Sequence, residues 1–116
     1  MNRLLSLLAL LALGGCYRSP TKEVVLLLPD LQTGEQVGVV KEWMREQDRA
    51  DGTQSYESIR VISDPPSLHV VYNPRHLADR NVEASVTEFG LRVNDLPGNP
   101  DRRDGVLSRI ASDTRP

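Results

Sequence analysis

The sequence predicts an all-β protein, a small antiparallel sheet or sandwich of five to six strands. Five short runs have the β-branched, alternating composition that is typical of strands. Gly, Pro, Asn and Asp separate these runs at spacings too short for βαβ crossovers. The chain has 116 residues, enough for one ordinary domain. Its single cysteine excludes an internal disulfide framework and a cysteine-based zinc site.

The chain begins with the pattern of a cleaved signal peptide, which we expect to span residues 1–15. Arg3 adds a positive charge near the start, and residues 4–13 are apolar except for Ser6. Ten such residues make about 15 Å of helix, which is half of a hydrocarbon core of about 30 Å. This length suits an export signal rather than a membrane span.

The leader ends in Leu13-Gly14-Gly15-Cys16, with small residues directly before the only cysteine. This arrangement resembles the lipobox of bacterial lipoproteins. The resemblance implies a diacylglyceryl group on the Cys16 thiol, cleavage before Cys16 and acylation of the freed amine. Several acyl chains would hold the protein on a membrane, with residues 16–23 as a lipidated tether. Tyr17 stands where enterobacterial lipoproteins retained in the inner membrane carry Asp, which favours the outer membrane, facing the periplasm.

The β domain is expected to span residues 24–93. The apolar run 24–28 predicts a strand buried on both faces, and residues 37–40 open a second strand after a turn. Residues 41–51 fit either a long hairpin or a short helix. The turn dipeptide Asp51-Gly52 favours the hairpin.

Three further strands are predicted in the second half of this domain. Residues 56–62 and 68–73 supply the third and fourth strands, and residues 82–87 alternate clearly between apolar and polar side chains. The apolar phase then shifts by one residue near Gly90. Such a shift predicts a bulge or a sharp bend at that point.

The last part of the chain differs in composition from the β domain. Residues 94–116 contain three Pro, two Gly, four Arg and four Asp. Val106, Leu107 and Ile110 would fit one docking turn of helix. However, so polar a segment buries little apolar area against the cost of ordering it. We therefore expect residues 94–116 to form a mostly disordered tail.

Few residues carry a pattern of chemistry. The chain contains no Gly-x-Ser-x-Gly, no Gly-rich phosphate loop and no His-Glu-x-x-His. His69 and His76, even with Asp79, do not have the spacing of a metal site. Glu42 and Glu46 are expected to be exposed acids. A net charge of −2 offers no basic excess for phosphates. We expect no enzymatic activity, no cofactor, no metal and no nucleic-acid partner.

Trp43 is the one candidate for partner binding. It is the only tryptophan of the chain, and tryptophan is enriched at the energetic centres of protein interfaces. The alternative is a partly buried residue of a strand or helix. An exposed Trp43 would anchor a protein or a polysaccharide.

A second pattern runs through residues 24–62. It consists of Val-Val-Leu-Leu-Leu-Pro-Asp at 24–30, Gly34, Val-Gly-Val-Val at 37–40, and Tyr56 in a later strand. This pattern is similar to the N-terminal periplasmic segment of some OmpA-like and FecR-like envelope lipoproteins. The resemblance implies an all-β accessory module of the cell envelope. No residues match the peptidoglycan-binding motif of the OmpA domain, so that activity is not carried over.

Together, these observations predict an outer-membrane lipoprotein with a structural or accessory role in the cell envelope. Its partners would be the membrane, through the Cys16 lipid, and another envelope protein or cell-wall component. The alternative is a pilotin or chaperone-like lipoprotein that escorts an envelope protein. An exposed apolar groove would favour the escort, and a uniformly polar surface would favour the accessory role. The missing catalytic pattern disfavours a lipid-tethered enzyme.

Overall fold

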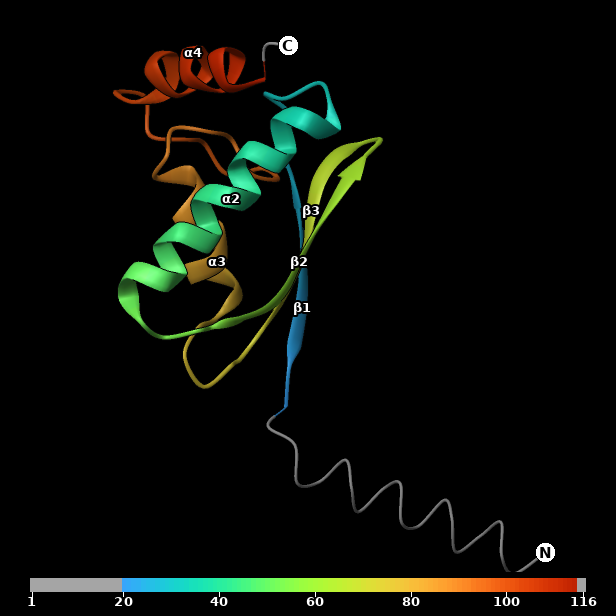
Figure 1. Ribbon diagram of the computed structural model, residues 1–116, viewed down its shortest axis with the longest axis vertical. Helices are drawn as coiled ribbons and strands as arrows, with labels where there is room; N and C mark the ends of the chain where they lie inside the picture. The colour runs from blue at the N-terminus through green and yellow to red at the C-terminus, as the bar shows by residue number, and fades with distance from the viewer. Residues whose placement is uncertain (1–19, 115–116) are drawn as a thin grey trace, which may run out of the picture.

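The computed structural model describes residues 20–114, which form one antiparallel sheet with helices packed on one of its faces (Figure 1). The elements in chain order are β1 (Lys22–Leu27), α2 (Gly34–Asp51), β2 (Tyr56–Ser63), β3 (Pro66–Tyr72), α3 (Asp79–Thr87) and α4 (Arg103–Asp113). Strand β3 lies in the centre, between β1 and β2. The prediction of an all-β sheet or sandwich of five to six strands is therefore wrong, because the described chain combines three strands with three helices.

The three strands lie where the β-branched runs predicted strands at 24–28, 56–62 and 68–73. Alternate side chains of the sheet point into a core beneath the helices. In the register, Val70 of β3 lies opposite Val24 of β1 and Ile59 of β2. The other face of the sheet is open, so β1 is not buried on both faces as expected: Val25 is 46% exposed and Leu27 is 43% exposed.

Helix α2 replaces the strand expected to open at residues 37–40, and at 41–51 the alternative of a helix is correct and the favoured hairpin is wrong. A capping box begins the helix. The Thr33 hydroxyl accepts a hydrogen bond from the Gln36 N–H (3.2 Å), and the Gln36 side chain accepts one from the Thr33 N–H (3.2 Å). Gly52, at φ +70°, ends the helix in the left-handed region. The Asp-Gly pair is thus a helix end and not a hairpin turn.

The spacing of the apolar residues in α2 explains why this segment forms a helix and not strands. Its buried residues are Val37, Val40, Met44 and Asp48. These positions lie three or four apart and form one stripe, which packs on β2 and β3. The same holds for α3, where a strand was expected. Its buried residues Val82 and Val86 are four apart, a spacing that fits both an alternating strand and one face of a helix.

The bend expected near Gly90 is present, but it follows a helix rather than interrupting a strand. Gly90 adopts φ +111°, which favours glycine. Gly98 packs against it so closely that a Cβ built at Gly98 would lie 2.6 Å from the carbonyl carbon of Gly90. This contact turns the Pro- and Gly-rich segment into a fixed connection between α3 and α4.

The prediction of a disordered tail is wrong for the described residues up to 114. Helix α4 forms there, and it places Val106 (9% exposed) and Ile110 (1% exposed) in the core. These two side chains are one helical turn apart, so a single docking contact buries both. The polar composition of the segment reflects the outer surface of α4.

Residues 1–19 lie outside the described part of the chain. The expected signal peptide 1–15, the Cys16 lipidation site and the first half of the tether 16–23 fall there. Between residues 20 and 114, no helix is long and apolar enough to cross a membrane.

Candidate partner-binding groove

An open groove of about 670 Å³ runs between α2 and α4. It combines an apolar floor with charged groups at its rim. Its lining residues are Trp43, Glu46, Gln47, Ala50, Phe89, Arg102, Gly105, Val106 and Arg109. The α2 residues among them share one helix face, since they recur at intervals of three or four. The opposite wall comes from α4 and the residue before it, from the segment that sequence composition assigned to a tail.

Trp43, the predicted partner-binding residue, lines this groove and is half-buried. Its ring meets that of Phe89 edge-to-face, with centroids 5.5 Å apart and planes at 75°. The guanidinium carbon of Arg109 lies 5.0 Å from the centroid of the Trp43 ring, within the range of a cation–π contact. Trp43 thus joins the core to the groove, packing inward while its outer side forms the floor.

Two arginines and one glutamate supply the charge of the groove. Arg102 donates from Nη1 to the carbonyl oxygen of Glu88 (3.3 Å), which leaves its other guanidinium donors unused by this bond. In the described chain, no Asp or Glu side chain lies within ion-pair distance of Arg102 or Arg109. Among the residues that the structure describes, Glu46 is the only acid that lines the groove. The groove therefore favours an anionic group over a cationic one.

Asp30 positions the α4 wall of the groove. Its side chain is only 5% exposed, and it pairs with Arg103 at the start of α4 (2.8 Å). Its second oxygen accepts a hydrogen bond from the Arg92 N–H (2.9 Å). Asp30 thus ties the loop after β1 to two points more than sixty residues further along the chain. Sequence analysis did not identify this role, because nothing in the local pattern indicates a partner so distant.

A second polar cluster surrounds Asp48 at the C-terminal end of α2. Asp48 Oδ1 accepts hydrogen bonds from the Ser55 N–H and from the Thr53 hydroxyl (both 2.9 Å). Asp48 Oδ2 accepts one from the Tyr56 N–H (3.3 Å). The Ser55 hydroxyl lies 3.5 Å from His76 Nδ1. The carboxylate serves backbone amides instead of orienting the histidine, so this serine, histidine and aspartate are not arranged as a catalytic triad.

The residues considered for metal binding are not brought together. His69 lies on the open face of the sheet, where its Nε2 is 3.4 Å from Glu23 and its Nδ1 is 3.3 Å from Arg60. Asp79 accepts a hydrogen bond from the Tyr72 hydroxyl. Within residues 20–114, no group of three or more His, Cys, Asp or Glu side chains is placed to hold a metal ion.

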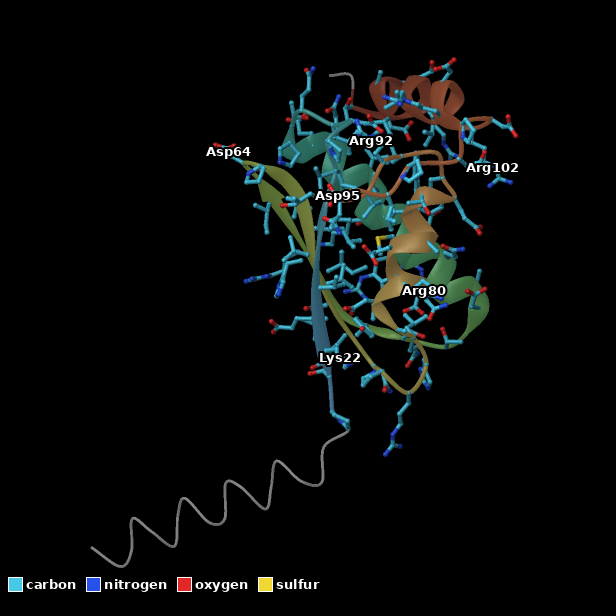
Figure 2. All side chains as sticks on the ribbon, turned by 180° about the vertical axis from the view of Figure 1, so that it is seen from behind. Lys22, Asp64, Arg80, Arg92, Asp95 and Arg102 are labelled. Atoms are coloured by element: carbon cyan, nitrogen blue, oxygen red, sulfur yellow. The ribbon has the colours of Figure 1, made fainter. Side chains whose placement is uncertain are left out.

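A smaller apolar cleft lies at the end of the open sheet face, beside the tip of the β2–β3 hairpin. Its volume is about 480 Å³, and its lining residues are Leu27, Leu28, Pro29, Pro65, Pro66, Asn94 and Asp95. Asp95 lines this cleft opposite the hairpin residues Pro65 and Pro66, and the adjacent Asp64 lies at the outer tip of the hairpin (Figure 2). The cleft lacks both the aromatic side chains and the basic groups of the α2–α4 groove, which is therefore the better candidate site.

Sequence reasoning reached one residue of the groove, Trp43. The sequence predicted a bulge or bend at Phe89, next to Gly90, and a disordered tail at Arg102 and Arg109. The spacing of Trp43, Glu46, Gln47 and Ala50 is the signal that would have joined the α2 residues, had 41–51 been assigned to a helix. The chain matches no family model, no curated protein and no solved structure, so its function is inferred from its own residues.

Proposed function

We propose that this protein is a lipid-anchored component of the bacterial cell envelope that binds another envelope protein in the groove between α2 and α4. The groove is the observation that carries the proposal. It presents a half-buried tryptophan, a second aromatic ring and two arginines on one surface. Tryptophan and arginine are the side chains most enriched at the energetic centres of protein interfaces.

The membrane part of the proposal rests on the leader sequence. The lipobox-like Leu13-Gly14-Gly15-Cys16 supports a lipid on Cys16, and Tyr17 supports sorting to the outer membrane with the folded part facing the periplasm. Strand β1 begins at Lys22, six residues after Cys16. An extended chain of that length reaches about 20 Å, so the lipid would hold the start of β1 close to the membrane surface, with α4 at the opposite end of the molecule (Figure 1).

The amphipathic groove favours the escort over a purely accessory role. A pilotin or chaperone-like lipoprotein needs a surface that holds an exposed segment of its client, and an open groove with an apolar floor meets that need. An accessory protein of the envelope needs no such recess. No cofactor enters this function, because binding and a lipid anchor are sufficient for it.

The membrane anchor is tested with the full chain in a Gram-negative host. A clickable palmitate analogue should label the wild type, and the labelled protein should fractionate with the outer membrane. The Cys16→Ser variant should lose the label and leave the membrane fraction. A Cys16→Ser variant that still carries the label, or a wild type that never does, would refute the lipid anchor.

Partner binding is tested by site-specific photo-crosslinking in the same cells. A photoreactive residue at Gln47, in the groove, should capture an envelope protein, whereas one at the exposed Glu57 on β2 should not. When Ala50→Trp is combined with the photoreactive residue at Gln47, the capture should be abolished, because the new side chain fills the groove without removing a core side chain. The matched Leu96→Ala change, at an apolar residue exposed outside the groove, should not. Equal capture from both positions would refute the groove as the binding site.

The role is then read from a strain that lacks this protein. If the protein is an escort, its crosslinked partner should no longer reach the outer membrane in that strain. A partner that reaches the outer membrane normally would assign the accessory role instead.

A further inference from the structure

We infer that the segment bound in the groove is acidic and amphipathic, with a carboxylate placed against Arg102 and Arg109 beside an apolar side chain that packs on the groove floor. This inference rests on the proposed function, since it specifies the chemistry of the partner. It follows from three features of the groove, which are its charge, its floor and the arrangement of its tryptophan.

The positive charge of the groove favours an anionic group on the bound segment. Arg102 and Arg109 are both exposed at the rim, with no carboxylate within 4.0 Å in the part of the chain that the structure describes. An arginine fork pairs with a carboxylate through two parallel hydrogen bonds, which are stronger than bonds between neutral groups. Glu46 opposes this attraction only in part, because it contributes one negative charge against two positive ones.

The apolar floor of the groove favours an apolar side chain next to the anionic one in the bound segment. Trp43, Phe89 and Val106 all pack against the core from the groove side. A volume of about 670 Å³ accommodates a few side chains rather than a whole domain. An anionic segment with one or two aliphatic side chains would bury this floor and also place its carboxylate near the arginines.

The arrangement of Trp43 argues against a sugar chain. A sugar ring packs flat on an open aromatic face, but Arg109 already lies over the Trp43 ring, and Phe89 contacts the ring edge-to-face. The contact with the Trp43 ring positions the Arg109 guanidinium at the groove before any partner arrives. A carboxylate therefore meets a guanidinium that has already lost part of its rotamer freedom, which lowers the cost of binding.

The experiment uses the full chain in detergent and the fluorescence of Trp43, the only tryptophan. Two acetylated and amidated peptides serve as probes: Gly-Leu-Asp-Asp-Leu-Gly, and the same peptide with Asn in place of Asp. We expect the acidic peptide to change the emission saturably, with a Kd about tenfold lower than that of its Asn counterpart. Salt at about 0.5 M should reduce the difference. Glu46→Gln should tighten the binding of the acidic peptide.

Matched variants locate the effect. Arg102→Gln with Arg109→Gln should bring the two peptides to equal affinity. Arg75→Gln with Arg80→Gln removes the same charge from an exposed loop and from the start of α3, where Arg80 lies apart from Arg102 (Figure 2), and should keep the preference. A circular dichroism spectrum like that of the wild type shows that each variant is folded.

Three results would overturn the inference: equal affinities of the wild type for the two peptides, no emission change with either, or displacement of the acidic peptide by the neutral disaccharide of N-acetylglucosamine. These results are independent of the crosslinking from Gln47. Groove-specific crosslinking without an acidic preference would reject only this inference. An acidic preference without any crosslinked envelope protein would reject the proposed function.

Discussion

At the scale of single residues, Tyr72 shows how a buried polar group joins the sheet to α3. Its side chain is fully buried at the end of β3, and its hydroxyl donates a hydrogen bond to Asp79 in the first turn of α3. Burial, with the Asp79 hydrogen bond and negative charge, raises the pKa of Tyr72 from 10.0 to about 12. The unfolded chain thus releases this proton at a lower pH than the native protein does. Tyr72 therefore contributes its full stability below pH 10, and the contribution is lost as the pH rises toward 12.

This shift predicts the pH dependence of a Tyr72→Phe variant. At pH 7 the variant should be less stable by about 1–2 kcal/mol, because it lacks the hydrogen bond to Asp79. Between pH 10 and 12 the difference should shrink, since only the wild type still loses stability through Tyr72. Urea unfolding at a series of pH values measures both effects. Tyr56 is present in both proteins, so its own contribution cancels when the two are compared. A difference that stays constant up to pH 12 would contradict the assignment.

Asn94 protects the free edge of β1. Its Oδ1 accepts a hydrogen bond from the Leu27 N–H (2.9 Å), and its own N–H donates to the Leu27 carbonyl (2.9 Å). It does so at φ +53°, a conformation that asparagine tolerates better than most residues. Exposed strand edges invite pairing with other chains, and this residue occupies the position that such a chain would take.

Replacing Asn94 separates the side-chain bond from the backbone conformation. Asn94→Ala should cost about 1–3 kcal/mol, because it leaves the Leu27 N–H without its acceptor and because alanine tolerates positive φ less well than asparagine. Asn94→Gly should cost about 1 kcal/mol less, since glycine adopts this φ freely. Denaturant midpoints measure both losses. Equal losses would show that the backbone conformation is not strained.

At the scale of elements, α4 belongs to the fold through only two buried side chains. Ile110→Ala should destabilise the protein by about 2–5 kcal/mol, because it removes a side chain that is 1% exposed from a closed core. Ser108→Ala, at an exposed position of the same helix, should change stability by less than about 0.5 kcal/mol. Ending the chain after Asp95 should cost at least as much as Ile110→Ala. A truncated chain as stable as the wild type would show that α4 does not contribute to the core.

At the scale of the whole molecule, one core connects the sheet, α2, α3 and α4. Val106 and Ile110 of α4 pack in the same cluster as the strands, and Asp30 ties α4 to the loop after β1. Small domains with a single core unfold in one cooperative step. We therefore expect Trp43 fluorescence, which reports on the α2–α4 groove, and far-ultraviolet circular dichroism to give the same urea midpoint.

Asp30 provides the test of this cooperativity. Asp30→Ala removes the partner of Arg103 and of the Arg92 N–H, and should lower both midpoints together, by about 1–3 kcal/mol in unfolding free energy. Asp95→Ala, an exposed acid in the same region (Figure 2), should leave both nearly unchanged. A fluorescence midpoint well below the circular dichroism midpoint would show that α4 detaches before the sheet unfolds.

Only part of the α2–α4 groove could be predicted from local sequence pattern. Trp43 was identified from its residue type alone, and it lines the groove. Arg102 and Arg109 carry no signal of their own, because each is one of fourteen basic residues scattered along the chain. They reach Trp43 only after α4 docks on α2. A binding site formed by segments about sixty residues apart is a property of packing, which local composition does not encode.

The sequence by itself determined the three strands, since β-branched runs bounded by turn residues suit a pleated, half-buried surface and little else. It did not determine the helices. The apolar residues of 37–40 and 82–87 are spaced so that they fit a helix face as well as a strand, and α4 has few apolar residues of its own. The tertiary structure decided these segments. The inner face of the sheet is apolar and must be shielded from water. Apolar residues four apart on a helix shield it in one layer. This arrangement removes more apolar surface from water than further strands at the edges would.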